Sequence, residues 1–295
     1  MYLTDGWQDY EIIDAGNGEK LERWGDVVLL RPDPQAIWPM KQAEHVDAHY
    51  IRSSSGGGAW SFNRRLPESW TIAYRDLKFI VRPTGFKHTG LFPEQAANWD
   101  FMRKFVENYR EKTGNKAFRV LNLFAYTGGA TAALAAAGAE VVHVDAAKGM
   151  VAWAKENLAA SGLADRPVRF IVDDVMKFVQ REKRRGHEYE GILMDPPSYG
   201  RGPDGEMWRI ETGLYPLVSE CMDLLSRDAG FFIINSYTTG LAPTVLKDVL
   251  KVASGKRGGK IDAQELCLPI TNNSLLLPCG CTARWCREPN EKQNK

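Results

Sequence analysis

The feature that most constrains the fold is a regular alternation of strand-like and helix-like segments from residue 118 onward. Apolar runs such as FRVLNLFA, AEVVHVD and EGILMD are separated by stretches with helical spacing, such as AAKGMVAWAKENLAASG. Strands that are apolar on both faces belong in a parallel sheet that helices cover on both sides. We therefore expect an α/β fold with a doubly wound, mostly parallel, seven-stranded sheet. Two strand-like stretches around Thr271-Asn272-Asn273 predict an antiparallel C-terminal hairpin that closes the sheet.

The N-terminal part of the chain has a different texture, rich in Trp, Tyr, Gly and Pro. Its short alternating segments, such as WGDVVLLRP and LKFIVRP, are typical of strands joined by turns. We expect a small β-rich domain at residues 1–90 and a larger α/β domain at residues 91–290. Pro93 at a first helical position and Gly114 at a C-terminal stop predict the helix that opens the second domain.

Composition and charge limit the classes of protein to which the chain can belong. The chain is 44% hydrophobic and 25% charged, as in ordinary globular proteins. It has no apolar run of roughly 18 residues, and its N-terminus has no basic region followed by an apolar one. Five cysteines do not indicate a disulfide framework, so we expect a cytoplasmic protein that does not bind membranes. With a formal net charge of +1, RNA contact would need local patches at 181–185, 64–65 or 256–257, which are otherwise solvated surface.

The ends of consecutive predicted strands carry residues suited to a ligand. In an open α/β sheet, ligands bind beyond the carboxyl ends of the strands, near the point where strand order reverses. Here the first strand leads into a glycine turn and the next three end in carboxylates. These strand ends are Phe124 to Gly129, Asp145, Asp173-Asp174, Asp195-Pro196-Pro197 and, on a fifth strand, Asn235-Ser236-Tyr237. Such a series predicts a nucleotide-shaped pocket.

Each of these positions has a physical role available. Gly128 and Gly129 permit close approach of backbone to a ligand. Asp145 follows Gly128 by 145 − 128 = 17 residues, a spacing at which a carboxylate can accept both hydroxyl hydrogens of a ribose. Asp174 could accept an adenine amino group. The alternative is that the glycines only form turns and the aspartates only cap the following helices.

The type of cofactor follows from what the glycine turn lacks. The sequence AYTGGA does not contain the G-x-G-x-x-G fingerprint of dehydrogenases, and no G-x-x-x-x-G-K-[ST] loop occurs in the chain. The cofactor therefore has a ribose and a base but no phosphate that needs a cradle. S-adenosylmethionine, with S-adenosylhomocysteine as its product, fits this description, and we expect no metal.

Four segments of the chain resemble motifs of a known family. NLFAYTGGATAALAAAGA, VVHVDAAKGMVAWAKENL, FIVDDVMKF and ILMDPPSYGRG are similar to the cofactor and catalytic motifs of class I S-adenosylmethionine-dependent methyltransferases. These enzymes have a Rossmann-like fold. More narrowly, the chain resembles the bacterial group that includes large-subunit ribosomal RNA methyltransferases, in which a small β-rich domain comes first. The resemblance covers roughly residues 85 to 285.

The resemblance implies roles for individual residues. The turn after the first strand would line the methionine and ribose side, Asp145 would hold the ribose, and Asp174 would face the adenine. Phe92 and Gln95, in a junction segment HTGLFPEQAANW, would cover the cofactor. Asn122 departs from the family, where an acidic residue is common, and would accept from the methionine ammonium as a neutral group. The implied cofactor-binding set is Phe92, Gln95, Asn122, Phe124, Tyr126, Thr127, Gly128, Asp145, Ala146, Lys148, Asp174, Val175 and Asp195.

The type of methyl transfer depends on cysteine. Carbon-5 of a pyrimidine is a poor nucleophile, and enzymes that methylate it use a cysteine thiolate to activate the ring. In the cytosine-5 relatives this cysteine follows the fifth strand, where this chain has Tyr237. The three cysteines of LPCGCTARWC have no further ligands at metal-site spacing and are expected to be buried packing residues. The sequence therefore favours transfer to a nucleophile with its own lone pair.

The segment DPPSY supplies the expected catalytic residues Asp195, Pro196, Pro197 and Tyr199. The two prolines would fix a corner with exposed carbonyls, Asp195 would accept a hydrogen bond or a proton, and Tyr199 would stack on a planar base. Our leading hypothesis is an enzyme that methylates a base of ribosomal RNA at a nitrogen. The alternatives are a methyltransferase for a small molecule or protein, and a non-catalytic cofactor- or RNA-binding module. The sequence leaves the methylated atom and the oligomeric state open.

Overall fold

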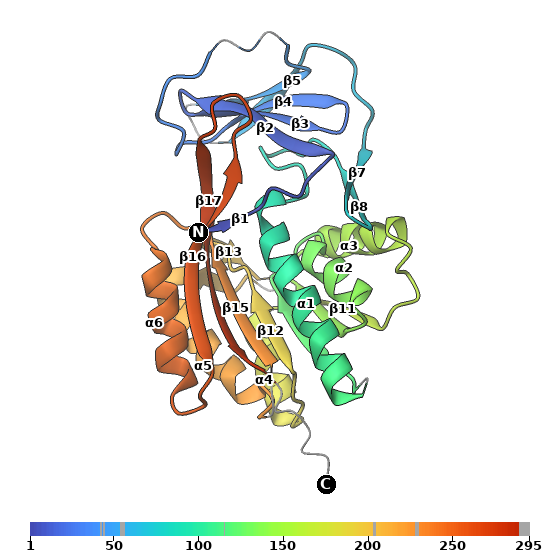
Figure 1. Ribbon diagram of the computed structural model, residues 1–295, viewed down its shortest axis with the longest axis vertical. Coiled ribbons are helices and arrows are strands. Elements are labelled where there is room, and N and C mark those ends of the chain that lie inside the picture. The colour runs from blue at the N-terminus through green and yellow to red at the C-terminus, as the bar shows by residue number, and fades with distance from the viewer. Residues whose placement is uncertain are drawn as a thin grey trace. The chain divides into compact units, whose positions relative to one another are not determined.

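The computed structural model describes residues 1–41, 43, 45–53, 57–114, 116–202, 205–227 and 230–288. Residue 290, where the second expected domain ends, lies outside these ranges. The chain forms two compact units (Figure 1). Unit 1 comprises Met1–Ala97 together with Leu266–Cys279, and unit 2 comprises Asn98–Glu265 together with the segment from Gly280 onward.

Unit 2 is built on the predicted parallel sheet. Five strands run parallel in the order β11, β10, β9, β12, β15, and β17 pairs antiparallel with β15. The central strands are fully buried: every residue of β12 and β15 is buried. Their bounds are β9 Arg119–Leu123, β10 Glu140–Asp145, β11 Val168–Val172, β12 Gly191–Met194, β15 Gly230–Ser236 and β17 Leu276–Arg287.

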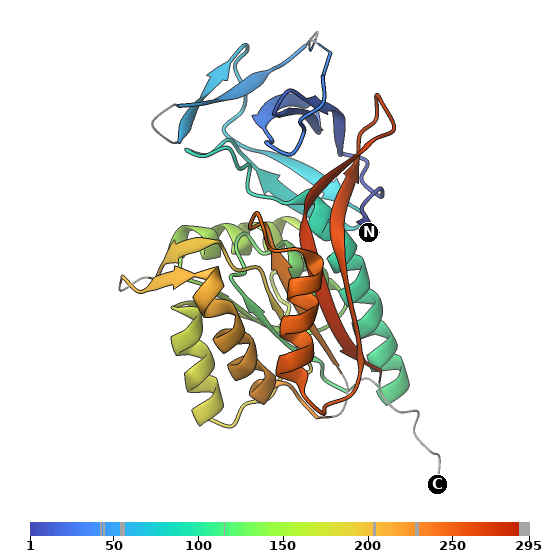
Figure 2. The same ribbon diagram turned by 90° about the vertical axis from the view of Figure 1, so that its left-hand side faces the viewer.

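Helices cover both faces of this sheet, as a doubly wound fold requires. In Figures 1 and 2, α1, α2 and α3 lie on one face and α4, α5 and α6 on the other. The second group packs on a core that includes Leu121, Ile192 and Phe232 from the sheet and Leu217 from α5. The helices are α1 Ala96–Thr113, α2 Gly129–Ala136, α3 Lys148–Ala160, α4 Val175–Arg184, α5 Ile210–Leu224 and α6 Pro243–Ser254. None of the helices in the described residues is long and apolar enough to span a bilayer.

The predicted C-terminal hairpin consists of β16 (Lys260–Pro269) and β17, which are adjacent in the sheet. Its tip, residues 266–279, belongs to unit 1. There a two-residue strand, β1 (Tyr2–Leu3), pairs parallel with Leu266 and Cys267 of β16. The seven predicted strands are thus present, and β1 adds an eighth that is too short to leave a pattern in the sequence.

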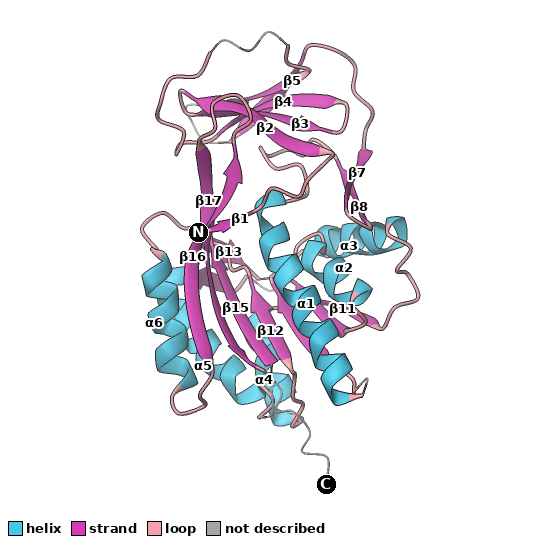
Figure 3. Cartoon of the chain, viewed as in Figure 1, coloured by secondary structure: helices cyan, strands magenta, loops and turns pink. Residues whose placement is uncertain are grey.

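Unit 1 is β-rich, as Figure 3 shows by colour. A five-stranded sheet has the order β2-β3-β4-β5-β6, and β7 and β8 form a separate antiparallel hairpin. A single 3₁₀ turn, η1 (Pro93–Gln95), precedes α1 and has its proline at the expected first position. The strands are β2 Tyr10–Gly16, β3 Glu19–Trp24, β4 Val27–Pro32, β5 Ala48–Arg52, β6 Gly58–Phe62, β7 Trp70–Tyr74 and β8 Leu77–Val81.

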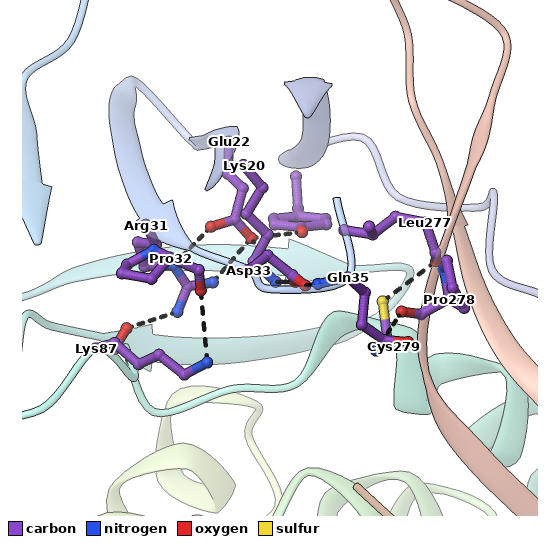
Figure 4. A network of polar contacts seen from close by, with 11 residues as sticks. Lys20, Glu22, Arg31, Pro32, Asp33, Gln35, Lys87, Leu277, Pro278 and Cys279 are labelled. Atoms are coloured by element: carbon purple, nitrogen blue, oxygen red, sulfur yellow. Dashed lines mark hydrogen bonds and ion pairs between the residues drawn. The ribbon is translucent and has the colours of Figure 1, made fainter. Parts of the chain in front are cut away.

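An ion network holds the centre of unit 1 (Figure 4). The fully buried carboxylate of Glu22 accepts two hydrogen bonds from Arg31, at 2.6 and 2.8 Å, and one from the Tyr10 hydroxyl at 2.7 Å. Lys20 lies 3.4 Å from Asp33. The hairpin tip joins the same region, because Gln35 Nε2 donates to the carbonyl of Pro278 at 2.9 Å. The charges of β3 and of the end of β4 are therefore paired within the unit.

Candidate active site

The site lies where strand order reverses in unit 2. The chain moves outward from β9 to β10 and β11, then returns to place β12 on the other side of β9. Leu123 of β9 is in register with Val144 of β10 and with Met194 of β12. The next residues along these strands, Phe124, Asp145 and Asp195, therefore lie in one row at the carboxyl edge. This is the switch point at which α/β sheets bind ligands.

The turn between β9 and α2 has an unusual backbone. Phe124 and Tyr126 adopt φ values of 52° and 51°, in the left-handed region that residues with side chains rarely occupy. Gly128, the residue before α2, has φ 81°. Strained backbone of this kind clusters at ligand sites, where the surrounding structure holds it in place. The turn predicted from AYTGGA is thus a tightly specified loop.

The two glycines of this turn also permit close packing of helices. A Cβ atom on Gly128 would lie 2.9 Å from Cβ of Ala154 in α3, and one on Gly129 would lie 2.6 Å from the Trp99 ring of α1. Both distances are shorter than side-chain atoms tolerate. The glycines therefore bring α2 against its neighbours, in addition to shaping the turn.

Asp145 fixes the same turn from the neighbouring strand. Its Oδ2 accepts a hydrogen bond from the backbone N–H of Tyr126, and its Oδ1 accepts one from Ala147, both at 2.8 Å. Burial raises the pKa of Asp145, and these two N–H groups offset part of that rise. Each carboxylate oxygen keeps a second lone pair, so the group can still accept hydrogen bonds from a pair of hydroxyls.

A buried polar chain runs beneath the turn. Asn122 Nδ2 donates to Thr131 Oγ1 at 2.9 Å, and that oxygen lies 2.9 Å from Nδ1 of His143. Burial lowers the pKa of His143 to about 3, so the ring is neutral. The amide nitrogen of Asn122 is thus used within the fold. Its oxygen is the atom that remains for the predicted role as an acceptor.

Asp174 is the N-cap of α4, as the alternative reading proposed. Its Oδ1 accepts from the backbone N–H of Lys177 at 2.8 Å. The other oxygen, Oδ2, is 3.2 Å from the position that a Cβ on Gly202 would take, so the carboxylate also borders the loop after β12. Val175, the first residue of α4, is buried. Capping does not preclude a ligand contact, because it uses one lone pair of one oxygen.

The corner after β12 is held by a residue that the sequence did not indicate. Pro196 is buried and Pro197 is exposed. The carbonyl of Pro197 accepts a hydrogen bond from Nε1 of Trp208 at 2.6 Å, and the Trp208 ring lies 5.1 Å from the ring of Phe124. Trp208 therefore joins the corner to the turn after β9. The carbonyl of Pro197, expected to be exposed, has this partner.

Trp208 is carried by a short antiparallel ribbon, β13 (Tyr199–Arg201) and β14 (Met207–Arg209). Tyr199 is 52% exposed, and its hydroxyl lies 3.4 Å from the sulfur of Met207. Ser198 Oγ lies 2.6 Å from Thr238 Oγ1, beyond the end of β15. The ribbon thus presents the Tyr199 ring to solvent beside the corner, where a planar ligand could stack.

A cysteine does lie next to the end of β15, although not at the position of the cytosine-5 relatives. Cys281 of β17 pairs with Ser236, and its thiol donates to the carbonyl of Leu241 at 3.2 Å. Burial raises the pKa of this thiol to about 11. Tyr237 packs on β17, since a Cβ on Gly280 would lie 2.9 Å from its ring. Among the described residues no cluster of His, Cys, Asp or Glu could hold a metal ion.

The remaining predicted residues divide between the two units. Thr127 is buried, and its carbonyl accepts from Asn157 Nδ2 at 2.8 Å. Ala146 is half-buried, and Lys148, the first residue of α3, is exposed. Phe92 and Gln95 belong to unit 1, at the N-cap and the last position of η1.

Together, the reversed strand order, the carboxylate row and a glycine turn without a phosphate loop define a Rossmann-like methyltransferase fold. Sequence comparison agrees: residues 29–208 match the S-adenosylmethionine-dependent methyltransferase family, and the chain belongs to it. It is therefore an S-adenosylmethionine-dependent methyltransferase, and the resemblance drawn from its motifs is confirmed. The carboxylate chemistry of the row fits this cofactor, whose ribose offers two hydroxyls.

Relatives of the chain include proteins named as ribosomal RNA methyltransferases. The chain is 30% identical over 206 residues to Ribosomal RNA large subunit methyltransferase K/L of Shewanella baltica, covering 69% of this chain and 27% of the relative. It is 32% identical over 134 residues to Ribosomal RNA large subunit methyltransferase I of Salmonella arizonae, covering 45% and 31%. The chain thus matches only about a third or less of the length of these curated relatives.

A solved structure matches nearly the whole chain. The crystal structure of the SAM-dependent methyltransferase from Agrobacterium tumefaciens is 36% identical, with a TM-score of 0.91 over 98% of this chain and 93% of that one. Both units of the present chain are thus included in the similarity.

Proposed function

We propose that this enzyme methylates a base of ribosomal RNA at a nitrogen by direct transfer. The names of its relatives support the RNA substrate, and a ribosomal substrate would be met in the cytoplasm. The cysteine thiols, which burial keeps protonated, support a nitrogen as the methylated atom. S-adenosylmethionine supplies a methyl group on a positively charged sulfur, and an amino nitrogen carries the lone pair that such a carbon needs.

The residues at the carboxyl ends of the strands have separate roles in the proposed reaction. Asp145 accepts the ribose hydroxyls with the lone pairs that the N–H groups of Tyr126 and Ala147 leave available. Asp174 borders the adenine. Asp195, in the same row as Phe124, accepts an N–H of the target amino group and so directs its lone pair toward the methyl carbon. Tyr199 stacks on the target base after that base has flipped out of the RNA helix.

The single observation on which the nitrogen target rests is the buried, protonated thiol of Cys281. Covalent activation of a pyrimidine ring needs a thiolate, and a thiol whose pKa is about 11 is protonated at neutral pH. Burial also raises the pKa values of Cys221, Cys279 and Cys286. A nucleophile that needs no covalent help is therefore the best match to this site.

The basic run of α4 gives little support for RNA contact. Lys183 lies 2.6 Å from Asp223, Arg185 lies 3.1 Å from Glu182, and Arg181 pairs with Asp173. Carboxylates thus neutralise much of the charge that the sequence places at residues 181–185. An RNA-binding surface must be sought elsewhere on the chain.

The test uses labelled S-adenosylmethionine, unmodified ribosomal RNA and the whole chain. We expect label in the RNA, which nucleoside analysis would place on a base nitrogen, and loss of most turnover in Asp195→Ala. A target base replaced by its 5-fluoropyrimidine analogue should not trap the enzyme covalently. Label on carbon-5, or label only in protein or small metabolites, would refute the proposal. The second of these outcomes would favour the small-molecule or protein alternative.

A further inference from the structure

Unit 1 exposes aromatic rings on two segments whose sequences contain no carboxylate. Residues 48–65 and 82–88 contain five Arg or Lys residues and no Asp or Glu. The chain as a whole is nearly balanced, with 38 basic and 37 acidic residues. The basic residues are Arg52, Arg64, Arg65, Arg82 and Lys87. This local excess of positive charge is suited to a polyanion.

Three aromatic side chains form what we call the aromatic surface: Trp60, Phe62 and Phe86. Phe62 is 52% exposed and Phe86 is 70% exposed. The rings of Trp60 and Phe62 are stacked with centroids 6.4 Å apart. Trp60 Nε1 donates to the carbonyl of Phe86 at 3.3 Å and to that of Thr84 at 2.9 Å. These contacts place the three residues beside one another.

The strand pairing explains why the aromatic rings gather. β6 is the edge strand of the five-stranded sheet and pairs with β5. Tyr50 is opposite Trp60, and its ring meets that of Trp60 edge-on at 5.4 Å. Tyr50 is buried and therefore supports Trp60 from below. Because neighbours on a strand alternate between faces, Ile51 lies on the opposite face of the same ribbon.

Positive charge borders the rings. Arg52, at the end of β5, is exposed and is in register with Gly58 at the start of β6. Burial lowers the pKa of Lys87, which follows Phe86, and the charges of Lys20, Arg31 and Arg52 lower it further. Arg52 and Lys87 thus lie within electrostatic reach of each other. Arg64 is bound to Asp47 and Nζ of Lys87 donates to the carbonyl of Pro32 at 3.4 Å, whereas Arg52 is exposed at the end of β5.

We propose that the aromatic surface binds unpaired nucleotides of the RNA, with bases stacked on Phe62 and Phe86 and phosphates beside Arg52. This inference rests on the proposed function for its choice of RNA. Exposed rings supported by a rigid neighbour stack on any base, and cations at their side follow the backbone. Paired bases are already stacked on one another, so the surface selects single strands over duplexes.

The experiment measures fluorescence anisotropy of a labelled single-stranded RNA of about 12 nucleotides, with the matching duplex as comparison. The chain is used whole. The double variant Phe62→Leu/Phe86→Leu keeps apolar bulk but cannot stack, and we expect its affinity to fall about tenfold or more. Phe62→Tyr should retain binding. Ile51→Ala, a control with the same 52% exposure on the other face, should bind as the wild type does.

Arg52→Gln tests the charge separately. The logarithm of the binding constant falls linearly with the logarithm of the salt concentration. Removing one phosphate contact should make this slope shallower by about 0.7 for a single strand. Unchanged melting temperature and cofactor affinity would show that the variants are folded. If the double variant melts early, Phe86→Leu alone, at the more exposed ring, gives the same comparison.

The proposal fails if the leucine variant binds single-stranded RNA as tightly as wild type, or if the duplex binds equally well. It also fails if sedimentation shows that the rings instead join two copies of the chain. Failure of the proposed function looks different: the oligonucleotide would bind as predicted, but no RNA would accept a methyl group.

Discussion

Nε1 of Trp208 donates a hydrogen bond to the carbonyl of Pro197 at 2.6 Å, while the same indole contacts the ring of Phe124. One side chain thus connects the turn after β9 with the corner after β12. Because methyl transfer depends on alignment of nucleophile and sulfonium, Trp208 is expected to act as a positioning residue.

Trp208→Phe removes the donor and keeps a ring. We expect kcat to fall about fivefold, since the loss of one hydrogen bond at the corner costs roughly 1 kcal/mol, with cofactor affinity little changed. Trp285→Phe is the matched control, because its indole donates to the Gly258 carbonyl at 2.7 Å, near the start of the parallel strands. Steady-state kinetics and calorimetric cofactor binding separate the two. Equal loss of kcat in both variants would show that Trp208 acts only through stability.

Asp145→Asn should weaken cofactor binding. Hydrogen bonds to a charged acceptor contribute about 1.5–3 kcal/mol, so we expect a loss of roughly 10- to 150-fold in affinity. Burial raises the pKa of Asp145, so its carboxylate gains a proton at a higher pH than an ordinary aspartate does. Cofactor affinity of the wild type should therefore fall as the solution becomes acidic.

Calorimetric titration with S-adenosylhomocysteine at several pH values measures both effects. The pH dependence should be absent in Asp145→Asn. Asp223→Asn, at an exposed position of α5, is the control and should behave as the wild type does. If Asp145→Asn binds the cofactor with wild-type affinity, Asp145 does not bind the ribose.

Much of this site could be predicted because its residues follow strands that are apolar on both faces. Such strands are visible in a single sequence, and so are the Gly, Asp and Pro residues that end them. The turn at Phe124 and the row of Asp145 and Asp195 were found in this way. The N-cap role of Asp174 was also foreseen as an alternative.

Other features depend on contacts between distant segments. Trp208 lies on a ribbon with three residues in each strand, too short to show a period. His143 is one residue of an ordinary strand pattern, and only Thr131 on a neighbouring helix reveals its role. The pairing of β1 with β16 joins residues more than 260 positions apart. No local pattern records such contacts.

Gly129→Ala should destabilise the fold although alanine favours helices. The added Cβ would lie 2.6 Å from the ring of Trp99, which is almost fully buried and cannot move freely. Overpacking of this kind costs about 1–3 kcal/mol. Gly149→Ala is the control, because a Cβ there meets nothing within 4 Å, and it should raise stability by about 0.5 kcal/mol. Urea unfolding measures both, and equal stabilities would contradict the packing role of Gly129.

Glu22 should set the acid stability of unit 1. Burial alone would raise its pKa, but the charges of Arg31 and Lys20 and the hydrogen bonds from Arg31 and Tyr10 lower it to about 2. In the unfolded chain the pKa is about 4.5. As the pH falls, the unfolded state therefore takes up the proton first. The stabilisation is complete above pH 4.5 and is lost between there and pH 2, by about 3 kcal/mol.

Glu22→Gln has nearly the same shape but leaves the charge of Arg31 buried without its partner. It should destabilise the chain by about 3–5 kcal/mol at neutral pH. Its remaining stability should lack the loss between pH 4.5 and 2 that Glu22 causes. The control is Glu11→Gln, because Glu11 pairs with Arg23 at 2.7 Å on a partly exposed surface, where such a pair contributes below about 1 kcal/mol. Denaturant unfolding across this pH range tests the network, and a Glu22→Gln profile parallel to that of the wild type would contradict it.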